Sequence, residues 1–205
     1  MGKDQLIEAL NFRHACKLFD TTKQISNDDM TFILESARLA PSSFGMEHCR
    51  ILHIKNKDVK KELKPLCWNQ NQIDSCSDLI VLVAKHKEVA SKEYYSKMFE
   101  RRGLDENSKK IYIEKYENYI NSLKSIKCWS EKQCYITASN IMNYSALIGI
   151  DSCPIEGFEK RNIEKKLGID DTAESIALLV ALGYRLNSQS AKIRLALNEI
   201  VTVID

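Results

Sequence analysis

The sequence lacks the motifs and the charge imbalance that would place it in one of the common functional classes. It contains no G-x-G-x-x-G, G-x-x-x-x-G-K-[ST], H-E-x-x-H or G-x-S-x-G segment. No apolar run approaches the length that spans a membrane. Lys and Arg number 30 and Asp and Glu 28, so the net charge is only +2. This balance gives no general attraction for nucleic acid. We therefore expect a cytoplasmic protein that partners neither membrane nor nucleic acid.

Cysteine is present, but not in a pattern that binds metal. The seven cysteines are an odd number and are scattered, with no C-x-x-C pair and no His/Cys cluster at metal-ligand spacing. We expect free thiols of a reducing compartment and no metal site.

The hydrophobic pattern predicts one mixed α and β domain over residues 1–205. Continuous β-branched apolar runs predict buried strands, and 3.6-residue periodicity with capping residues predicts helices. The expected helices are 4–11, 26–39, 57–66, 130–148 and 160–167, and the expected strands are 51–56, 78–85 and 175–185. Residues 90–127 are polar with interspersed aromatics, as in helices on a surface or in an excursion.

The closing segment EIVTVID, residues 199–205, has an apolar strand pattern. A strand this apolar needs a sheet edge, because an exposed one invites aggregation. It can pair within its own chain or add to the sheet of a second copy.

Two basic segments lie far apart in the sequence. The first has Arg13, His14 and Lys17 within FRHACKLFD, and the second has Lys192 and Arg194 within AKIR. Each is consistent with an ordinary solvated surface. Each is also consistent with an anion site, since Lys192 and Arg194 point the same way on an extended segment.

Glycine and proline are scarce, at seven and three residues, yet two Gly and one Pro surround Glu156 in GIDSCPIEGF, residues 149–158. Pro154 removes a backbone N–H, and Gly157 permits close backbone approach. A tight turn between helices explains this composition, and so does a loop that presents backbone amides to a ring. The segment APSSFG, residues 40–45, is either a plain loop after a helix broken by Pro41 or a source of hydroxyl and backbone donors.

Taken in order, these segments resemble the nitroreductase family of FMN-dependent NAD(P)H oxidoreductases, and within it the oxygen-insensitive bacterial nitroreductases. The resemblance covers nearly the whole chain, and DSCPIEGF and APSSFGME carry most of its weight. The matching segments are RHACKLFD, RLAPSSFGME, WNQNQI, WSEKQCYITASNIM, IGIDSCPIEGF, ALGYR and AKIR.

The resemblance implies an α+β fold with a central, mostly antiparallel sheet surrounded by helices, in a homodimer with an exchanged C-terminal strand. It also implies an FMN site at the dimer interface. The residues expected to contact FMN are Arg13, His14, Ala15, Lys17, Asn69, Pro154, Ile155, Glu156, Gly157, Lys192 and Arg194, together with Pro41, Ser42, Ser43 and Gly45 from the other subunit.

Within this set, the resemblance gives Lys17, Glu156 and Gly157 the catalytic positions. Lys17 and Arg13 would face the phosphate and the N1/O2 side of the flavin, where a cation stabilises the negative charge of the reduced ring. The backbone amides of Glu156 and Gly157 would approach N5, the atom that exchanges hydride. Lys192 and Arg194 would bind the phosphate, and Asn69 would bind the polar edge of the ring.

The implied activity is two-electron, ping-pong reduction of a small acceptor such as a nitroaromatic, a quinone or free flavin, with NADH or NADPH as donor. Glu47, His48, Cys49 and Gln72 depart from the pattern of many relatives, which leaves the acceptor and the choice of nicotinamide open. Two alternatives stay open: another FMN-dependent reductase or dehydrogenase on the same fold, and a non-enzymatic flavin-binding or interaction dimer.

Overall fold

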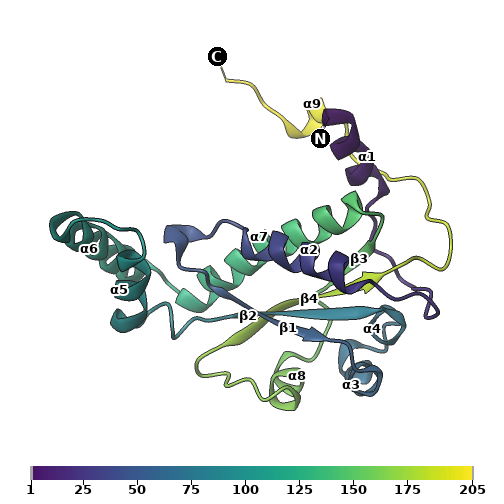
Figure 1. Ribbon diagram of the computed structural model, residues 1–205, viewed down its shortest axis with the longest axis horizontal. Coiled ribbons are helices and arrows are strands. Elements are labelled where there is room, and N and C mark those ends of the chain that lie inside the picture. The colour runs from purple at the N-terminus through teal and green to yellow at the C-terminus, as the bar shows by residue number, and fades with distance from the viewer. Residues whose placement is uncertain (1, 205) are drawn as a thin grey trace.

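The computed structural model describes residues 2–204, which are arranged around one four-stranded antiparallel sheet (Figure 1). The strands are β1 (Cys49–Ile54), β2 (Asp78–Ala84), β3 (Asp151–Ile155) and β4 (Ser175–Gly183), in the order β1-β2-β4-β3. The two central strands, β2 and β4, are the two continuous apolar runs. They are buried because both faces of the sheet are covered.

The two faces of the sheet pack against different helices. Alternate residues of β2 divide between them: Leu79, Val81 and Val83 lie on one face and Ile80 and Leu82 on the other. The first face is covered by α3 (Lys57–Leu63), α4 (Gln72–Ser75) and α8 (Lys160–Lys166), and the second by α2 (Asn27–Arg38) and the long helix α7 (Ile126–Leu147).

Local sequence signals set the ends of the helices on the second face. Ser26 caps α2 by accepting a hydrogen bond from the N–H of Asp29, and Ser125 caps α7 in the same way through Cys128. Helix α7 ends before Gly149, whose φ of +74° closes the turn. Leu39, the last residue of the helix expected at 26–39, lies beyond the observed helix end and is 64% exposed.

The remaining helices lie at the two ends of α7. Helix α1 (Lys3–Phe12) lies against α7, and α5 (Lys92–Glu100) and α6 (Glu106–Ser122) form the excursion seen at the left of Figure 1. The excursion has its own aromatic core, which includes Tyr95, Phe99, Tyr116 and Trp129. The polar, aromatic character of residues 90–127 is explained by this arrangement.

Two segments differ from the elements considered for them within one chain. Residues 151–155 form the edge strand β3, paired with β4 from Asp151↔Gly183 to Ile155↔Leu179, and are not part of a turn between helices. At the other end, no strand is found in residues 186–204. Helix α9 (Leu197–Ile200) stands where the terminal strand was expected to begin, and irregular chain follows to Ile204. Asp205, the last residue of the expected strand, lies outside the described residues.

Candidate functional site

The segment after α1 is fixed beside strand β3. Ala15 forms a parallel bridge with Ser152, and the N–H of Cys16 donates to the Ser152 carbonyl at 3.1 Å. Arg185 secures the same corner, because its guanidinium pairs with the buried Asp151 and donates to the Phe12 carbonyl at 3.0 Å. These contacts bring RHACKLFD, DSCPIEGF and ALGYR together.

Lys17 lies on this corner with its charge unbalanced. Its side chain is exposed and contacts the Cys153 sulfur at 3.6 Å, a weak acceptor. Among residues 2–204 no ion pair includes Lys17. Burial raises the pKa of the Cys153 thiol, and the nearby ammonium of Lys17 opposes that rise. Lys17 is therefore able to turn toward an anionic group on this surface.

Arg13, Lys192 and Arg194 form a second group of cations, which we call the basic cluster. The Lys192 ammonium donates to the carbonyl of Arg13 at 2.5 Å and to that of Leu10, so it also caps the end of α1. Burial and the positive charges of Arg13 and Arg194 lower the pKa of Lys192. No acidic partner of the cluster occurs in the described chain.

Two buried nitrogens beside the basic cluster lack hydrogen-bond partners. They are Nε of Arg13 and Nε2 of His14, whose other ring nitrogen lies 3.0 Å from the Phe12 carbonyl. Buried polar atoms are seldom left unpaired unless a ligand, ion or water satisfies them. Three cations and two unsatisfied nitrogens suit a phosphate or another compact anion.

The turn after β3, residues 156–159, has two carbonyls that accept hydrogen bonds. The Glu156 carbonyl accepts from the N–H of Phe158 at 3.1 Å, and the Gly157 carbonyl accepts from the Gln70 amide at 2.8 Å. The N–H of Glu159 donates to the Leu66 carbonyl at 2.8 Å. Within residues 2–204, no hydrogen bond outside the helices and strands is donated by the N–H of Glu156 or Gly157. Two backbone donors are thus available to a ligand.

The structure explains why residue 157 is a glycine. A Cβ built there would lie 2.5 Å from Cζ3 of the Trp68 ring and 3.3 Å from the Gln70 amide nitrogen. Trp68 is itself 66% exposed, so its ring covers the turn from the solvent side. From the sequence, the bound ring alone was expected to require a residue without a side chain here. In this structure, the Trp68 indole occupies the space where such a side chain would lie.

Strained backbone is concentrated in the two loops that carry expected site residues. Among residues 2–204, the non-glycine residues with positive φ are Phe44, Glu47, Trp68 and Asn69, with φ between 48° and 55°. Such conformations are uncommon away from glycine and are often found at functional sites. Asn69 is exposed next to Trp68, and its N–H donates to the Lys64 carbonyl at 3.0 Å.

Tyr135 is a neighbour of the turn that the sequence did not reveal. Its hydroxyl donates to the carboxylate of Glu156, and both residues line a pocket of about 330 Å³ that also includes Pro154. Burial and the neighbouring Glu156 carboxylate raise the pKa of Tyr135 to about 12, so its hydroxyl stays protonated at neutral pH. It lies within the helix expected at 130–148 and is 42% exposed.

The expected residues Pro41, Ser42, Ser43 and Gly45 lie elsewhere in the chain. The N–H of Ser43 donates to Gln133 at 2.9 Å. Gln133 and Tyr135 are two residues apart on α7, which places them about 200° apart around its axis. Helix α7 therefore lies between this loop and the 156–159 turn, and one chain does not bring the two together. Figure 1 shows the loop after α2 on the side of α5 and α6.

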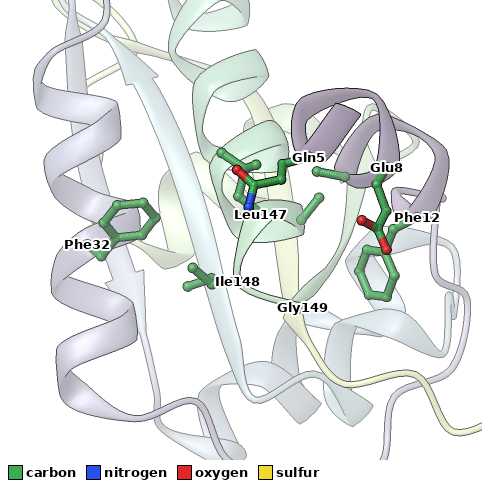
Figure 2. A pocket seen from close by; sticks show the side chains of 9 residues that line it. Gln5, Glu8, Phe12, Phe32, Leu147, Ile148 and Gly149 are labelled. Carbon is green, nitrogen blue, oxygen red and sulfur yellow. The ribbon is translucent and has the colours of Figure 1, made fainter. Parts of the chain in front are cut away.

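A further pocket lies away from all these residues. It has a volume of about 460 Å³, and Figure 2 shows Gln5, Glu8 and Phe12 of α1, Phe32 of α2 and the end of α7 around it. Its lining is mainly apolar, and exposed Leu6, Ile7 and Leu10 extend the apolar surface along α1. None of the expected site residues lines it.

Two further observations concern residues 2–204 as a whole. None of their helices combines the length and the apolar character needed to cross a bilayer. Nor do they contain a group of three or more His, Cys, Asp or Glu side chains placed to hold a metal ion.

Comparison with known proteins identifies the fold and the family. A protein of Staphylococcus haemolyticus named "Putative NAD(P)H nitroreductase" is 33% identical over an alignment of 213 positions, which covers 97% of each chain. The crystal structure of a nitroreductase-like protein of Streptococcus mutans superposes with a TM-score of 0.90 at 20% identity, over 100% of both chains. A structure from Exiguobacterium sibiricum, described as "a putative nitroreductase in complex with FMN", gives 0.83 at 24% identity, over 97% of both.

The model of the nitroreductase family matches residues 10–184, which include β3, the 156–159 turn and both central strands. The match covers most of the chain, and it agrees with the fold and with the order of the motifs. The chain therefore belongs to the nitroreductase family, whose members are oxidoreductase enzymes.

Proposed function

We propose that this protein is an FMN-dependent NAD(P)H oxidoreductase that reduces nitroaromatics or quinones by two electrons. The observation that carries the proposal is the pair of available backbone donors at Glu156 and Gly157 beside the unpaired charge of Lys17. The names of relatives support the same chemistry: the S. haemolyticus protein is named for NAD(P)H and nitro compounds, and the E. sibiricum protein binds FMN.

The residues present suit FMN at its phosphate end. The unsatisfied nitrogens of Arg13 and His14 need an acceptor, and phosphate oxygens are strong acceptors. Lys192 and Arg194 bring two further positive charges to the same place. We assign these four residues to the phosphate, with Ala15 holding the segment against β3.

The residues present also suit the flavin ring. We assign the N–H groups of Glu156 and Gly157 to N5 and its edge, and Lys17 to the N1/O2 side. Pro154 and Ile155 would lie along one face of the ring, and Asn69 would bond its polar edge. FMN, when bound, supplies hydride acceptance from NAD(P)H and electron delivery to the acceptor. The residues orient the ring and stabilise the charge that it gains.

A second copy of the chain would complete the site. The loop with Pro41, Ser42, Ser43 and Gly45 is separated from the turn by α7, so we assign it to the flavin of a partner subunit. Exposed apolar residues of α1 and of the C-terminal segment, among them Ile193, Leu195 and Leu197, provide surface for such a homodimer. All seven cysteines are free, which fits the reducing cytoplasm.

The direct test is the visible spectrum of the purified protein without air. We expect a flavin band that bleaches on addition of NADH or NADPH and returns with a nitroaromatic or a quinone. Recovery with free flavin alone would favour flavin reduction on the same fold. A protein that stays colourless after incubation with FMN would contradict the proposal and favour an interaction dimer.

A further inference from the structure

Two glutamines, Gln70 and Gln72, lie directly behind the 156–159 turn. The amide nitrogen of Gln70 donates to the Gly157 carbonyl at 2.8 Å and to the Cys67 carbonyl at 3.0 Å. Both its N–H groups are therefore committed to carbonyls. Its oxygen accepts from the amide nitrogen of Gln72 at 2.8 Å. Every polar group of the Gln70 side chain is thus paired, which leaves its amide a single orientation.

Gln72 anchors this arrangement in the core. It is the first residue of α4 and is only 3% exposed. Its amide also interacts with the buried Cys153 sulfur, the atom that Lys17 contacts at 3.6 Å. A continuous series of contacts therefore runs from Lys17 through Cys153, Gln72 and Gln70 to the Gly157 carbonyl.

The series matters because each carbonyl shares a rigid planar peptide group with the N–H of the next residue. A hydrogen bond to the Glu156 carbonyl therefore fixes the direction of the Gly157 N–H, and a bond to the Gly157 carbonyl fixes the peptide that follows it. Gln70 holds the Gly157 carbonyl, and the N–H of Phe158 holds that of Glu156. The two N–H groups without partners are those of Glu156 and Gly157.

We propose that Gln70, with its amide oriented by Gln72, is a positioning residue that directs the Glu156 and Gly157 N–H groups at the hydride-accepting atom of the cofactor. This inference rests on the proposed function, and it assigns a role to two residues that lie behind the turn. A donor that binds two carbonyls cannot be replaced by a carboxylate, which has only acceptor oxygens.

The test compares Gln70→Met and Gln70→Glu with the control Gln24→Glu, a change at an exposed residue. The basic cluster is untouched, so we expect FMN to be retained in all three. Flavin reduction by NADH in a single turnover should slow by between about tenfold and about a hundredfold in both Gln70 variants. The control should match the wild type. Gln72→Met should slow reduction by less than Gln70→Glu, because it frees the Gln70 amide without repelling the carbonyl.

A second readout needs no flavin. In the FMN-free protein, the N–H groups of Phe158 and Glu159 are hydrogen-bonded and should exchange slowly with deuterium. They should exchange at least about tenfold faster in Gln70→Met. Unchanged exchange and unchanged reduction would overturn the inference, as would loss of FMN in parallel with the rate, which indicates a general role in folding. Failure of the proposed function itself is recognised separately, because wild-type protein would then show no reducible flavin.

Discussion

The expected flavin residues divide into two regions that differ in how they are held. The first, which we call the turn side, consists of 13–17, 154–157 and the basic cluster. Its parts come from distant stretches of chain and are joined by direct contacts, such as Ala15 with Ser152 and Lys192 with Arg13. The second, the loop side, is the single stretch 41–45. It packs instead on the excursion, with the Phe44 ring 5.2 Å from those of Tyr116 and Tyr119.

The difference means that one chain does not bring the two regions together. The turn side has donors and cations without partners, whereas the loop side is tied to α7 and α6 on the other side of the long helix. If both regions bind the same flavin, they must come from different subunits. This is a stronger reason to expect a dimer than exposed apolar surface, because the partner would contribute to the site itself.

The largest effect should come from damaging the two regions in different subunits of one dimer. One variant combines Arg13→Ala with Lys17→Ala and damages the turn side. The other, Gly45→Val, damages the loop side, because residue 45 has a φ of +61° and a Cβ there would lie 3.3 Å from the Arg102 guanidinium. We expect each homodimer to lose its flavin. A hybrid dimer with one chain of each kind keeps one undamaged site of two and should bind about half the wild-type FMN.

Two affinity tags allow the hybrid to be purified, and absorbance of the flavin per protein gives its content. Thermal melting of each parent dimer checks that the variants fold. A hybrid as poor in flavin as its parents would show that the two regions do not serve the same flavin across an interface.

A smaller effect should follow from removing single cations on the turn side. Lys17→Ala and Arg194→Ala each delete one charge that has no acidic partner in the described chain, so the free protein should lose little stability. FMN dissociation constants should rise by about tenfold or more for each, as expected for a hydrogen bond assisted by charge. Fluorescence titration of apoprotein with FMN measures this. Lys124→Ala is a control at a distant residue, and equal affinity in all four proteins would reject the assignment.

A third effect separates the two reasons for glycine at position 157. Gly157→Ala should cost about 1 to 3 kcal/mol, because its Cβ meets the Trp68 ring. The double variant Gly157→Ala with Trp68→Ala should recover most of that stability, as measured by urea denaturation. If hydride transfer stays slow in the double variant, the ligand also requires a residue without a side chain at position 157. If activity returns together with stability, Trp68 alone accounts for the glycine.

Much of the fold could be predicted from the sequence where a local pattern has only one solution. The apolar runs at 78–85 and 175–185 predicted β2 and β4, because their continuous burial suits a strand covered on both faces. Strand β3 was missed because Pro154 and the flanking glycines resemble a turn. Pairing with β4 makes it a strand, and such pairing is not encoded locally. The C-terminal pattern predicted a strand, but an apolar pattern does not specify a partner edge.

The site divides in the same way. The basic residues and the unusual glycine were proposed for the site because charge and backbone freedom are properties of single residues. Gln70 and Tyr135 were given no part in the site, and Gln72 was noted only as a departure from many relatives. Each contacts a neighbour more than twenty residues away or another side chain. Their importance depends on which groups the fold brings within hydrogen-bond distance.

The last effect concerns the loop side and the dependence of its stability on pH. His48, just after the loop, is fully buried beside Ser130 and Trp129, and burial lowers its pKa to about 4. In the unfolded chain a histidine titrates near pH 6.5. Below that pH the unfolded state therefore binds more protons than the native state, and stability falls as the pH drops from about 6.5 to about 4. At pH 5 this contribution to the free energy of unfolding amounts to a loss of about 2 kcal/mol.

Urea denaturation at pH 7.5 and pH 5 tests this in wild type and in His48→Gln, which retains a polar group facing Ser130 but does not titrate. The variant should be less stable at pH 7.5 and should lose about 2 kcal/mol less on acidification. An identical pH dependence in the two proteins would mean that His48 is accessible to protons in the native state. Because His48 packs beside the loop and not beside the turn, FMN affinity should depend on pH in the same way in wild type and in His48→Gln. If the substitution changes the pH dependence of FMN affinity, the two regions are coupled within one chain.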